Sequence, residues 1–464
     1  MRNVVLLCLD TVRKDYFDQY APRLRDRADV VYDQCRSVSS WSVSSHASMF
    51  TGKLPSDNGI HAYRRDFSGL ARKDTFMRAL EDHRTLGISA NVWASSAFGF
   101  DGMFDSFSDV SPDRRFPEGI HVGQFGQNCE REGLGKQIAF LRAALSHDHP
   151  IQSLANGALV QFDDVTARLP LPKPLDDGAK SITRRAQSMI KNGSEPFFLF
   201  ANLMDAHGPV RHIVGFDPDL HDAPLDWTSE TESWGDVLDA GNETLIERYR
   251  GLYGASIDYL DRVVCSFIDA VQAATDRETT FVITSDHGDN LRHDGDDEQW
   301  GHIRSSLSEA LLHVPQVVVN APESIGQVPD YISHLSLGDL IVGLSNGEVP
   351  DVCRERIPAE RAGYSGKLHR MDEVSEEKNR ALRCVYEGDR KYVWDGNRGK
   401  EVYRLDADRA SWEERVDEEF NIEPYESELF SGPLSAFAER LGDGSATPDV
   451  DAATEDRLRD LGYM

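Results

Sequence analysis

The chain has 464 residues, 40% of them hydrophobic, and a formal net charge of -29 from 79 acidic and 50 basic residues. This length predicts a large domain with a smaller one, and the charge argues against non-specific binding to DNA, RNA or anionic membranes. Only 11 of the basic residues are Lys, and 39 are Arg. Acid excess with scarce Lys favours a halophilic protein over a merely acidic mesophilic one, because dense carboxylates keep a protein hydrated at high salt.

Cysteine usage and hydropathy give no indication of a secreted or membrane protein. The six cysteines are scattered singly, without a CxxC pair of the zinc-ribbon or redox kind. No apolar stretch approaches the length of a membrane span. The segment 3–9, NVVLLCL, is predicted to be a buried strand, and removing an N-terminal leader would remove it. We therefore expect a cytoplasmic protein.

Strand and helix patterns alternate in the first part of the chain. NVVLLCLD at 3–10 and VVYDQCRSVSS at 30–40 are strand patterns. SSHASMFTG at 44–52 has the Ser N-cap, body and closing Gly of a helix. ANVWASSAFGF at 90–100 predicts a further strand and a loop. Residues 110–180, rich in Gly, Pro and charge, predict an elaborated insertion.

The same alternation continues through the middle of the chain. SITRRAQSMIKNG at 181–193 and residues 243–274 are amphipathic helix patterns. PFFLFANLMDAHGP at 196–209 and TTFVITSDHGDN at 279–290 are apolar strands that end in polar residues, and HVPQVVVNAP at 313–322 is one more strand. Strands that alternate with helices predict an α/β fold with a doubly wound, mostly parallel sheet flanked by helices.

The character of the sequence changes near residue 350. RALRCVYEGDRKYVWDGNRGKEVYRLDAD at 380–408 predicts short antiparallel strands with a DGN turn. An acidic tail follows and ends in LRDLGYM. We therefore predict a catalytic domain over 1–350 and a small C-terminal α+β domain over 351–464 that contains an antiparallel sheet.

Polar clusters follow three of the predicted strands. They are Asp10-Thr11, Asp205-Ala206-His207 and Asp286-His287. The carboxyl ends of parallel strands share one edge of a sheet, so these clusters can converge, and Ser42 begins a helix over that edge. Carboxylates, an imidazole and a hydroxyl suit Mn²⁺, Mg²⁺, Ca²⁺ or Zn²⁺. A divalent ion would make the Ser42 hydroxyl a nucleophile at neutral pH, and the helix N-terminus would stabilise a phosphate or sulfate.

Each feature also has a purely structural explanation. An Asp after a strand is often a helix N-cap, SDHGDN could be a glycine turn, and a serine-rich stretch is usually a loop. The order of the clusters and their shared placement at strand ends nevertheless favour a functional site.

As an ordered set, these motifs resemble the sulfatase family of the alkaline phosphatase superfamily. NVVLLCLDTVRKDYF resembles the first strand with its metal-binding Asp, and PFFLFANLMDAHGPV resembles the strand with the active-site His. WSVSSHASMFTGKLPSDNGIH resembles the nucleophile segment C-x-P-S-R-x-S-x-x-T-G-[RK], and TSDHGDN the second metal-binding segment. KYVWDGNRGKEVYRLDAD resembles the closing strands of the family's small C-terminal domain, and LGYM a frequent ending. The resemblance covers nearly the whole chain, least well across 90–180.

The resemblance implies metal ligands and catalytic groups at the matching positions. Asp10, Ser42, Asp286 and His287 would bind one divalent ion (Mn, Zn, Ca or Mg), with a second ion as a further option. Ser42 would also be the nucleophile, and His207 would protonate or position the leaving group.

The implied substrate-binding residues are His46, Lys53 and His302, and the surrounding pattern departs from the family. Conversion of the nucleophile to formylglycine needs Pro or Ala two residues on and Arg four residues on, where this chain has Ser44 and His46. We therefore expect Ser42 to act as plain serine. The sulfate-gripping Gly-Lys-Trp-His segment of the family is not found, and Asp286-His287 replaces the usual Asp-Asn. These departures resemble the phosphoester branches of the superfamily, where Mn²⁺ or Zn²⁺ is commoner than Ca²⁺.

Together these observations predict a metal-dependent hydrolase of sulfuric or phosphoric esters that forms a covalent intermediate on Ser42. One alternative is a transferase that passes the phospho or sulfo group to a sugar or lipid hydroxyl, and another is an inactive, metal-free binding homologue. The expected substrate is a small-molecule, glycan or lipid ester, without a nucleic-acid partner or a membrane span. The sequence does not indicate the ester or the oligomeric state.

Overall fold

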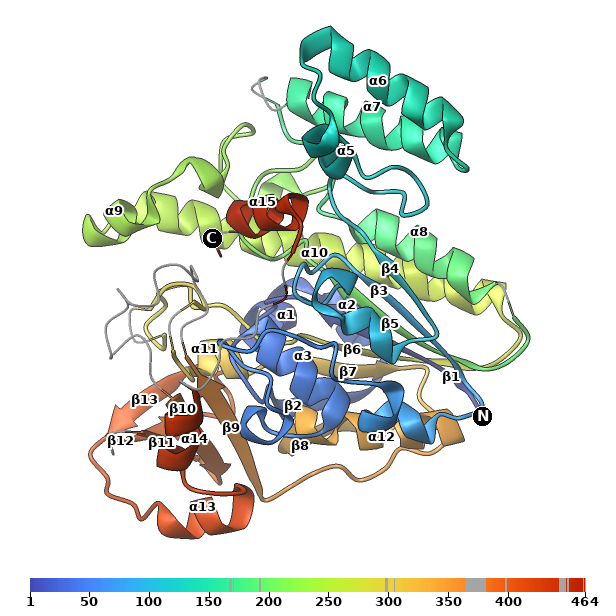
Figure 1. The fold of residues 1–464 in the computed structure, drawn as a ribbon. Coiled ribbons are helices and arrows are strands. Elements are labelled where there is room, and N and C mark those ends of the chain that lie inside the picture. Colours follow the sequence, from blue (N-terminus) through green and yellow to red (C-terminus); the bar gives the residue numbers. More distant parts are fainter. Residues whose placement is uncertain are drawn as a thin grey trace.

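The computed structural model describes residues 1–463 except 167, 168, 170, 192, 297, 298, 304, 364–380, 397, 398, 442–447, 449 and 462. These residues form a large sheet and a smaller one (Figure 1). The large sheet has the order β4-β3-β5-β1-β6-β7-β2-β8. Its strands are β1 (Asn3–Leu9), β2 (Ala28–Arg36), β3 (Arg84–Ser89), β4 (Ser106–Asp109), β5 (Phe197–Leu203), β6 (Thr279–Thr284), β7 (Gln316–Val319) and β8 (Gly326–Ser333).

The helices are distributed along the whole chain. They are α1 (Lys14–Tyr20), α2 (Pro22–Asp26), α3 (Ser42–Thr51), α4 (Pro55–Asn58), α5 (Val122–Asn128), α6 (Gly133–Ser146), α7 (Pro150–Thr166), α8 (Ala179–Ile190), α9 (Trp234–Asp239), α10 (Glu243–Ala274), α11 (Glu309–Leu312), α12 (Leu337–Asn346), α13 (Glu423–Leu429), α14 (Leu434–Leu441) and α15 (Ala452–Asp460). None of those in the described parts of the chain combines the length and apolarity needed to cross a membrane.

The large sheet is mostly parallel, as predicted. β1 pairs in parallel with β5 and β6, and β3 with β4 and β5. β7 runs antiparallel between β6 and β2. β1, β5 and β6 are buried along their whole length, because helices cover both faces of the sheet and leave no side of these strands in water.

The two faces of the sheet have separate apolar cores. Val5, Leu7 and Leu9 of β1 pack into a core shared with α1, α2, α8 and α10. The alternate residues Val4 and Leu6 pack on the other face, into a core shared with α3 and α12. This alternation follows from the two-residue period of a strand. The sheet is therefore covered on both faces, in the predicted doubly wound arrangement.

Two local predictions fail. Residues 90–100 are not a strand, because the Asn91 side-chain oxygen accepts from the backbone N–H of Trp93 at 2.8 Å and turns the chain. The strand of this region is β3, which ends at Ser89. The predicted Ser N-cap of α3 is also wrong: the cap is Trp41, without a side-chain hydrogen bond, and the helix already begins at Ser42. The closing Gly52 is confirmed, with a φ of 65°.

The C-terminal part contains the predicted antiparallel sheet. Its order is β13-β12-β11-β10-β9, formed by β9 (Arg356–Ala362), β10 (Ala381–Glu387), β11 (Arg390–Asp395), β12 (Lys400–Leu405) and β13 (Glu413–Val416). Helix α15, near the end of the described residues, lies beside α5 (Figure 1). Side-chain hydrogen bonds from Gln124 to Asp451 and from Gln127 to Asp456 join α15 to α5.

Helix α3 is held by an aromatic cluster, which makes Phe50 a test of the core. Its ring is fully buried and lies within 5.3 Å of the Phe100 ring and 5.2 Å of the Phe200 ring. We expect Phe50→Ala to lower the free energy of unfolding by about 3–5 kcal/mol, measured by urea denaturation, because the substitution leaves a cavity. Phe116→Ala, at a ring that is 36% exposed, is the control and should cost far less. Equal losses in both variants would contradict this account of the core.

Candidate active site

Two aspartates meet at the carboxyl edge of the large sheet because their strands are neighbours. Asp10 follows β1 directly, and Asp286 lies two residues beyond β6, which pairs with β1. Asp10, Asp286 and His287 each offer a ligand atom, and these atoms lie within 4.8 Å of one another. All three side chains have no exposed surface. The structure therefore brings together these three predicted metal ligands.

In each carboxylate, one oxygen accepts hydrogen bonds from protein groups and the other does not. The Asp10 Oδ2 accepts from the side-chain amides of Asn91 at 2.6 Å and Asn202 at 3.1 Å. The Asp286 Oδ1 accepts from the backbone N–H of Thr11 at 3.2 Å and of His287 at 2.9 Å. The second oxygens, Asp10 Oδ1 and Asp286 Oδ2, have no hydrogen-bond partner among the described residues. Buried polar atoms rarely stay unpaired, so a cation is the natural partner for both.

The backbone at this edge is strained where it serves the site. Thr11 has a φ of 61°, in the left-handed region, and this conformation turns its N–H toward Asp286. A β-branched residue adopts that region at a cost, and such strain tends to be found at functional sites.

The electrostatics of the two carboxylates also favour a cation. Burial and the charge of Asp286 raise the pKa of Asp10 well above its usual value. Burial also acts to raise the pKa of Asp286, but His287, His46 and the Ser42 hydroxyl outweigh it, so that pKa is lowered. A divalent ion would relieve the repulsion between the two carboxylates. The donor set, two carboxylates with an imidazole, fits Mn²⁺ or Zn²⁺.

Ser42 is the first residue of α3 and faces His287. The Nδ1–H of His287 donates to the carbonyl of Gly288 at 2.7 Å, which leaves Nε2 as the ligand nitrogen. That Nε2 lies 3.2 Å from the Ser42 Oγ. Burial lowers the pKa of His287 to about 4, so the ring is neutral at pH 7, as a metal ligand must be. Ser42 is thus placed beside the ligand set at the N-terminus of a helix, which attracts anions.

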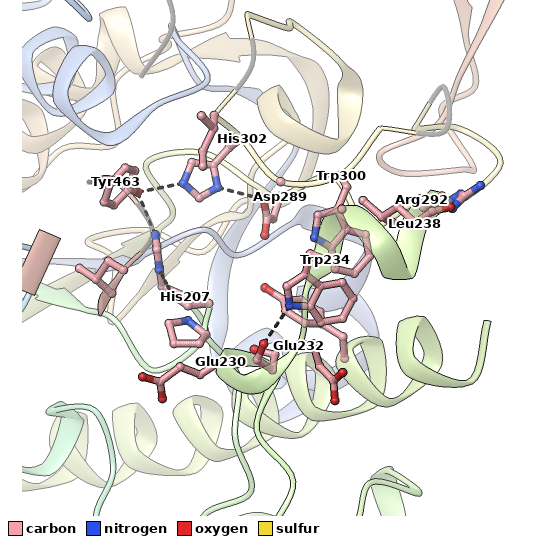
Figure 2. A pocket seen from close by; sticks show the side chains of 18 of the residues that line it. His207, Glu230, Glu232, Trp234, Leu238, Asp289, Arg292, Trp300, His302 and Tyr463 are labelled. Carbon is pink, nitrogen blue, oxygen red and sulfur yellow. Dashed lines mark hydrogen bonds and ion pairs between the residues drawn. The ribbon is translucent and has the colours of Figure 1, made fainter. Parts of the chain in front are cut away.

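A second set of polar groups adjoins this centre. The hydroxyl of Tyr463 lies 2.9 Å from the Nε2 of His207 and 2.9 Å from the Nε2 of His302 (Figure 2). The Nδ1–H of His207 donates to the Gly208 carbonyl at 2.5 Å, and the Nδ1 of His302 lies 2.9 Å from the Asp289 carboxylate. The His302 and His287 rings are 4.7 Å apart between centroids, so the two sets are continuous.

A cavity of about 990 Å³ opens beside this second set. His207, His302 and Tyr463 line it. Farther out its wall includes the stacked rings of Trp234 and Trp300, whose centroids are 4.6 Å apart (Figure 2). Such rings offer a flat apolar surface to a ligand, with polar groups at one end, as in many small-molecule sites.

Other predicted positions lie elsewhere. His46, one helical turn after Ser42, uses Nδ1–H to donate to the Ser42 carbonyl at 2.7 Å, and its Nε2 lies 3.2 Å from the Asn202 side-chain amide. Lys53 is exposed just beyond Gly52, at the opposite end of α3 from Ser42. Asp205 accepts from the backbone N–H groups of Asp177 and Ala179, at the start of α8. The structure therefore brings His46 to the centre as a bracing group, but not Lys53 or Asp205.

Sequence reasoning missed several groups that shape the site. The missed residues are Asn91, Asn202, Asp289, Arg65 and Tyr463. Asn202 lies in the strand predicted at 196–209 and Asp289 in the SDHGDN motif, so their positions close to the predicted polar clusters could have indicated them. Arg65 is fully buried with its guanidinium 4.9 Å from the Trp41 ring and 5.0 Å from the Trp93 ring, and nothing in its local sequence indicates this.

The fold and this site define the class of the protein. A serine at a helix N-terminus, beside two carboxylates and an imidazole at the carboxyl edge of a parallel sheet, is an arrangement for attack on an ester. The protein is an α/β ester hydrolase.

Comparisons with known proteins identify its family. The chain belongs to the Sulfatase family, whose model matches residues 2–346. A comparison with curated protein sequences found no match.

Solved structures share the fold over nearly the whole chain. A protein solved with its substrate D-glucosamine-2-N,6-O-disulfate is 13% identical, with a TM-score of 0.58 and 99% of both chains covered. A phosphonate monoester hydrolase from Silicibacter pomeroyi is 15% identical, with a TM-score of 0.57, and covers 100% of this chain and 96% of its own. A 2-O GAG sulfatase is 12% identical, with a TM-score of 0.56 and the same coverage, 100% and 96%.

The carboxylate pair yields a two-sided prediction about stability. After metal removal we expect Asp10→Asn to be at least as stable as the wild type, because the neutral amide ends the repulsion with Asp286. Added Mn²⁺ or Zn²⁺ should stabilise the wild type by about 2.7 kcal/mol at a hundred times its Kd, and should leave the variant unchanged. Differential scanning calorimetry with and without the ion measures both effects.

The pH dependence of this metal effect has a definite sign. The pKa of Asp10 is raised in the folded protein, so a proton competes with the ion for this carboxylate as the pH falls. The metal-induced stabilisation should therefore shrink at lower pH. A metal effect that persists in Asp10→Asn, or that grows on acidification, would contradict the assignment of Asp10.

Proposed function

We propose that the protein hydrolyses phosphoric esters, with Ser42 as an unmodified serine nucleophile and a divalent ion held by Asp10, Ser42, Asp286 and His287. The observation that carries the proposal is the position of the Ser42 Oγ, 3.2 Å from the ligand nitrogen of His287. The ion, when bound, would supply positive charge that lowers the pKa of the serine hydroxyl. The acid-rich composition supports assays at high salt.

The chain's own residues divide the reaction between them. The Ser42 hydroxyl loses its proton to water, and its Oγ forms a bond to phosphorus as the bond to the leaving oxygen breaks. A water molecule then bonds to phosphorus as the Oγ–phosphorus bond breaks, and Ser42 takes up a proton again. His207 would give a proton to the leaving oxygen. Burial lowers the pKa of His207 to about 3, which keeps the ring neutral in the free enzyme. A bound anionic ester would raise that pKa and favour the protonated ring.

The residues that follow Ser42 favour phosphoric over sulfuric esters. The sulfatase neighbours and the phosphonate monoester hydrolases share one fold, so the choice depends on the residues around the nucleophile. The positions two and four residues after Ser42 are Ser44 and His46, and both ring nitrogens of His46 contact protein groups. His46 is therefore a brace for the Ser42 turn, and a serine that stays a serine matches the phosphoester branches that the motifs resemble.

Ser42→Ala tests the nucleophile. We expect kcat for a p-nitrophenyl phosphate mono- or diester to fall at least about 10³-fold, since removal of an enzyme's nucleophile leaves only residual catalysis. The metal-induced stabilisation should largely persist, because Asp10, Asp286 and His287 remain. The assay uses metal-stripped protein with Mn²⁺ or Zn²⁺ restored, in high salt, and p-nitrophenyl sulfate in parallel.

Ser44→Ala is the matched control, because Ser44 is also buried on α3 and its hydroxyl has no hydrogen-bond partner among the described residues. It should retain activity. Peptide mass spectrometry should find Ser42 with the mass of serine. Turnover of the sulfate ester alone, a formylglycine mass at position 42, or activity that survives Ser42→Ala would each overturn the proposal.

A further inference from the structure

The nucleophile is closed off from the cavity that would receive a substrate. Ser42, Asp10, Asp286 and His287 have no exposed surface, and none of them lines the cavity of about 990 Å³. His207, His302 and Tyr463 line that cavity, and Figure 2 shows the hydrogen bonds that join them. The His302 ring is 4.7 Å from the His287 ring between centroids, so this set separates the cavity from the four buried residues. Access to Ser42 therefore requires that one of these groups moves.

The Tyr463 hydroxyl occupies the point on which both histidines converge. The Nδ1 of His207 is committed to the Gly208 carbonyl, and the Nδ1 of His302 to Asp289. The Nε2 atoms are the ring nitrogens left for a substrate, and both contact the Tyr463 hydroxyl at 2.9 Å. If His207 protonates the leaving oxygen, as proposed above, that oxygen must take the place of the phenol oxygen.

We propose that the Tyr463 phenol is an internal mimic of the alcohol product, held in the subsite of the leaving-group oxygen, and that substrate binding displaces the C-terminal tail. This inference rests on the role proposed for His207. The surroundings of the phenol also indicate which class of ligand the subsite would accept. The Tyr463 ring packs edge-on against Trp93 with centroids 5.4 Å apart and lies beside both histidine rings, so the subsite accepts a phenol, and the matching substrate is an aryl ester.

A buried guanidinium near the phenol, that of Arg65, suits the anionic group of such an ester. Both nitrogens at the end of the Arg65 guanidinium lack a hydrogen-bond partner among the described residues. Burial lowers the pKa of Arg65 to about 9, and Tyr463 is the strongest group acting against that shift. A buried cation without a carboxylate partner is costly, and an anion bound near the phenol's place would reduce that cost.

The tail is attached weakly enough to move. Leu458 and Tyr463 are its buried side chains among the described residues after 450, and the others are half-buried or exposed. The backbone N–H of Tyr463 donates to the Leu458 carbonyl at 2.8 Å, which places the tyrosine in a turn directly after α15. A short helix held by two buried side chains and two exposed hydrogen bonds to α5 is the kind of segment that opens locally at low free-energy cost.

Calorimetric titration with p-nitrophenol tests the subsite without any turnover. The proteins are the wild type, Tyr463→Ala and a chain that ends after Leu461. Removing the internal competitor should tighten p-nitrophenol binding by about 10-fold or more, since a binding-competent state that is rarely populated weakens apparent affinity. KM for p-nitrophenyl esters should fall in parallel with kcat undiminished. Glu455→Ala, on α15 with Tyr463 intact, is the control and should match the wild type.

Opposite results would overturn the inference. Unchanged p-nitrophenol affinity in both tail variants would remove Tyr463 from the subsite. A lower kcat with unchanged KM in Tyr463→Ala would make the phenol a working part of the site instead. If no variant turns over any ester, the proposed function fails, but the p-nitrophenol titration still decides whether Tyr463 occupies a phenol subsite.

A separate observation concerns the helical hairpin of α6 and α7, which projects away from the large sheet (Figure 1). Seven of the 14 large apolar side chains that the described chain exposes lie on these two helices. They are Leu134, Ile138, Leu141, Leu145, Ile151, Phe162 and Val165. The spacing of four, three and four residues along α6 places its four residues on one face. An exposed apolar patch of this kind marks an interaction surface.

We infer that this face binds the same face of a second copy of the chain. The stripe has the spacing of helix-to-helix packing. The hairpin 133–166 carries two basic and three acidic residues, a net charge of -1, whereas the whole chain carries -29. Two copies therefore meet with least repulsion here, while the charge of the rest of the chain would repel an anionic membrane.

Sedimentation velocity in high salt tests the dimer, because apolar contacts strengthen in such a solvent. The wild type should be a dimer, and Leu141→Asp with Val165→Asp should be a monomer with unchanged turnover and melting temperature. Lys136→Glu is the control: it lies two residues from both Leu134 and Ile138, on the opposite side of α6, and should remain a dimer. A monomeric wild type, an assembly unaffected by the double variant, or flotation of the wild type with phosphatidylcholine vesicles would overturn the inference.

Discussion

The repulsion between two buried carboxylates is the constraint on which the site depends. Asp10 and Asp286 follow neighbouring strands, and each keeps one unpaired oxygen with no exposed surface. Such a pair persists only because Asn91, Asn202 and the strained Thr11 backbone hold the remaining oxygens. The fold thus maintains a local concentration of negative charge that a divalent ion would stabilise, and every other group of the site is arranged around it.

The large sheet and the ligand set were predictable because both are local in sequence. Apolar runs that end in Asp10 and Asp286 indicate strands and strand ends, and neighbouring parallel strands leave little freedom in where those ends meet. Ser42 was also predictable, since a helix must begin near it. The strand registers that bring the site together were not predictable. Asn202 reaches Asp10 only because β5 pairs with β1 so that Leu203 lies opposite Leu9, and no local sequence pattern specifies that register.

The positions of Tyr463 and Arg65 could not be predicted from the sequence, for a different reason. Tyr463 is 256 residues from His207 and 161 from His302, and its position depends on the packing of α15 beside α5. Arg65 is held by two tryptophans that are distant in sequence. Long-range contacts of this type arise when whole helices and strands pack together, and no hydrophobic periodicity in a single sequence indicates them. The failed strand at 90–100 shows the converse, because one side-chain hydrogen bond from Asn91 outweighs an apolar pattern.

The histidines are held in a way that fits the attack and departure proposed for this buried site. His287 donates Nδ1–H to Gly288, and His207 donates Nδ1–H to Gly208, so in each ring a backbone carbonyl fixes which nitrogen faces inward. The inward nitrogen of His287 lies beside the Ser42 Oγ, the nucleophile proposed above, and that of His207 lies beside the Tyr463 hydroxyl. The His302 ring is near both of the others, 4.7 Å from His287 and 5.2 Å from His207 between ring centroids, so the attack and departure proposed above would take place within one continuous set of side chains. In-line displacement at phosphorus requires the incoming and departing oxygens to lie on opposite sides of the phosphorus, and the roles proposed for Ser42 and His207 assign those two oxygens to two separate groups of this set.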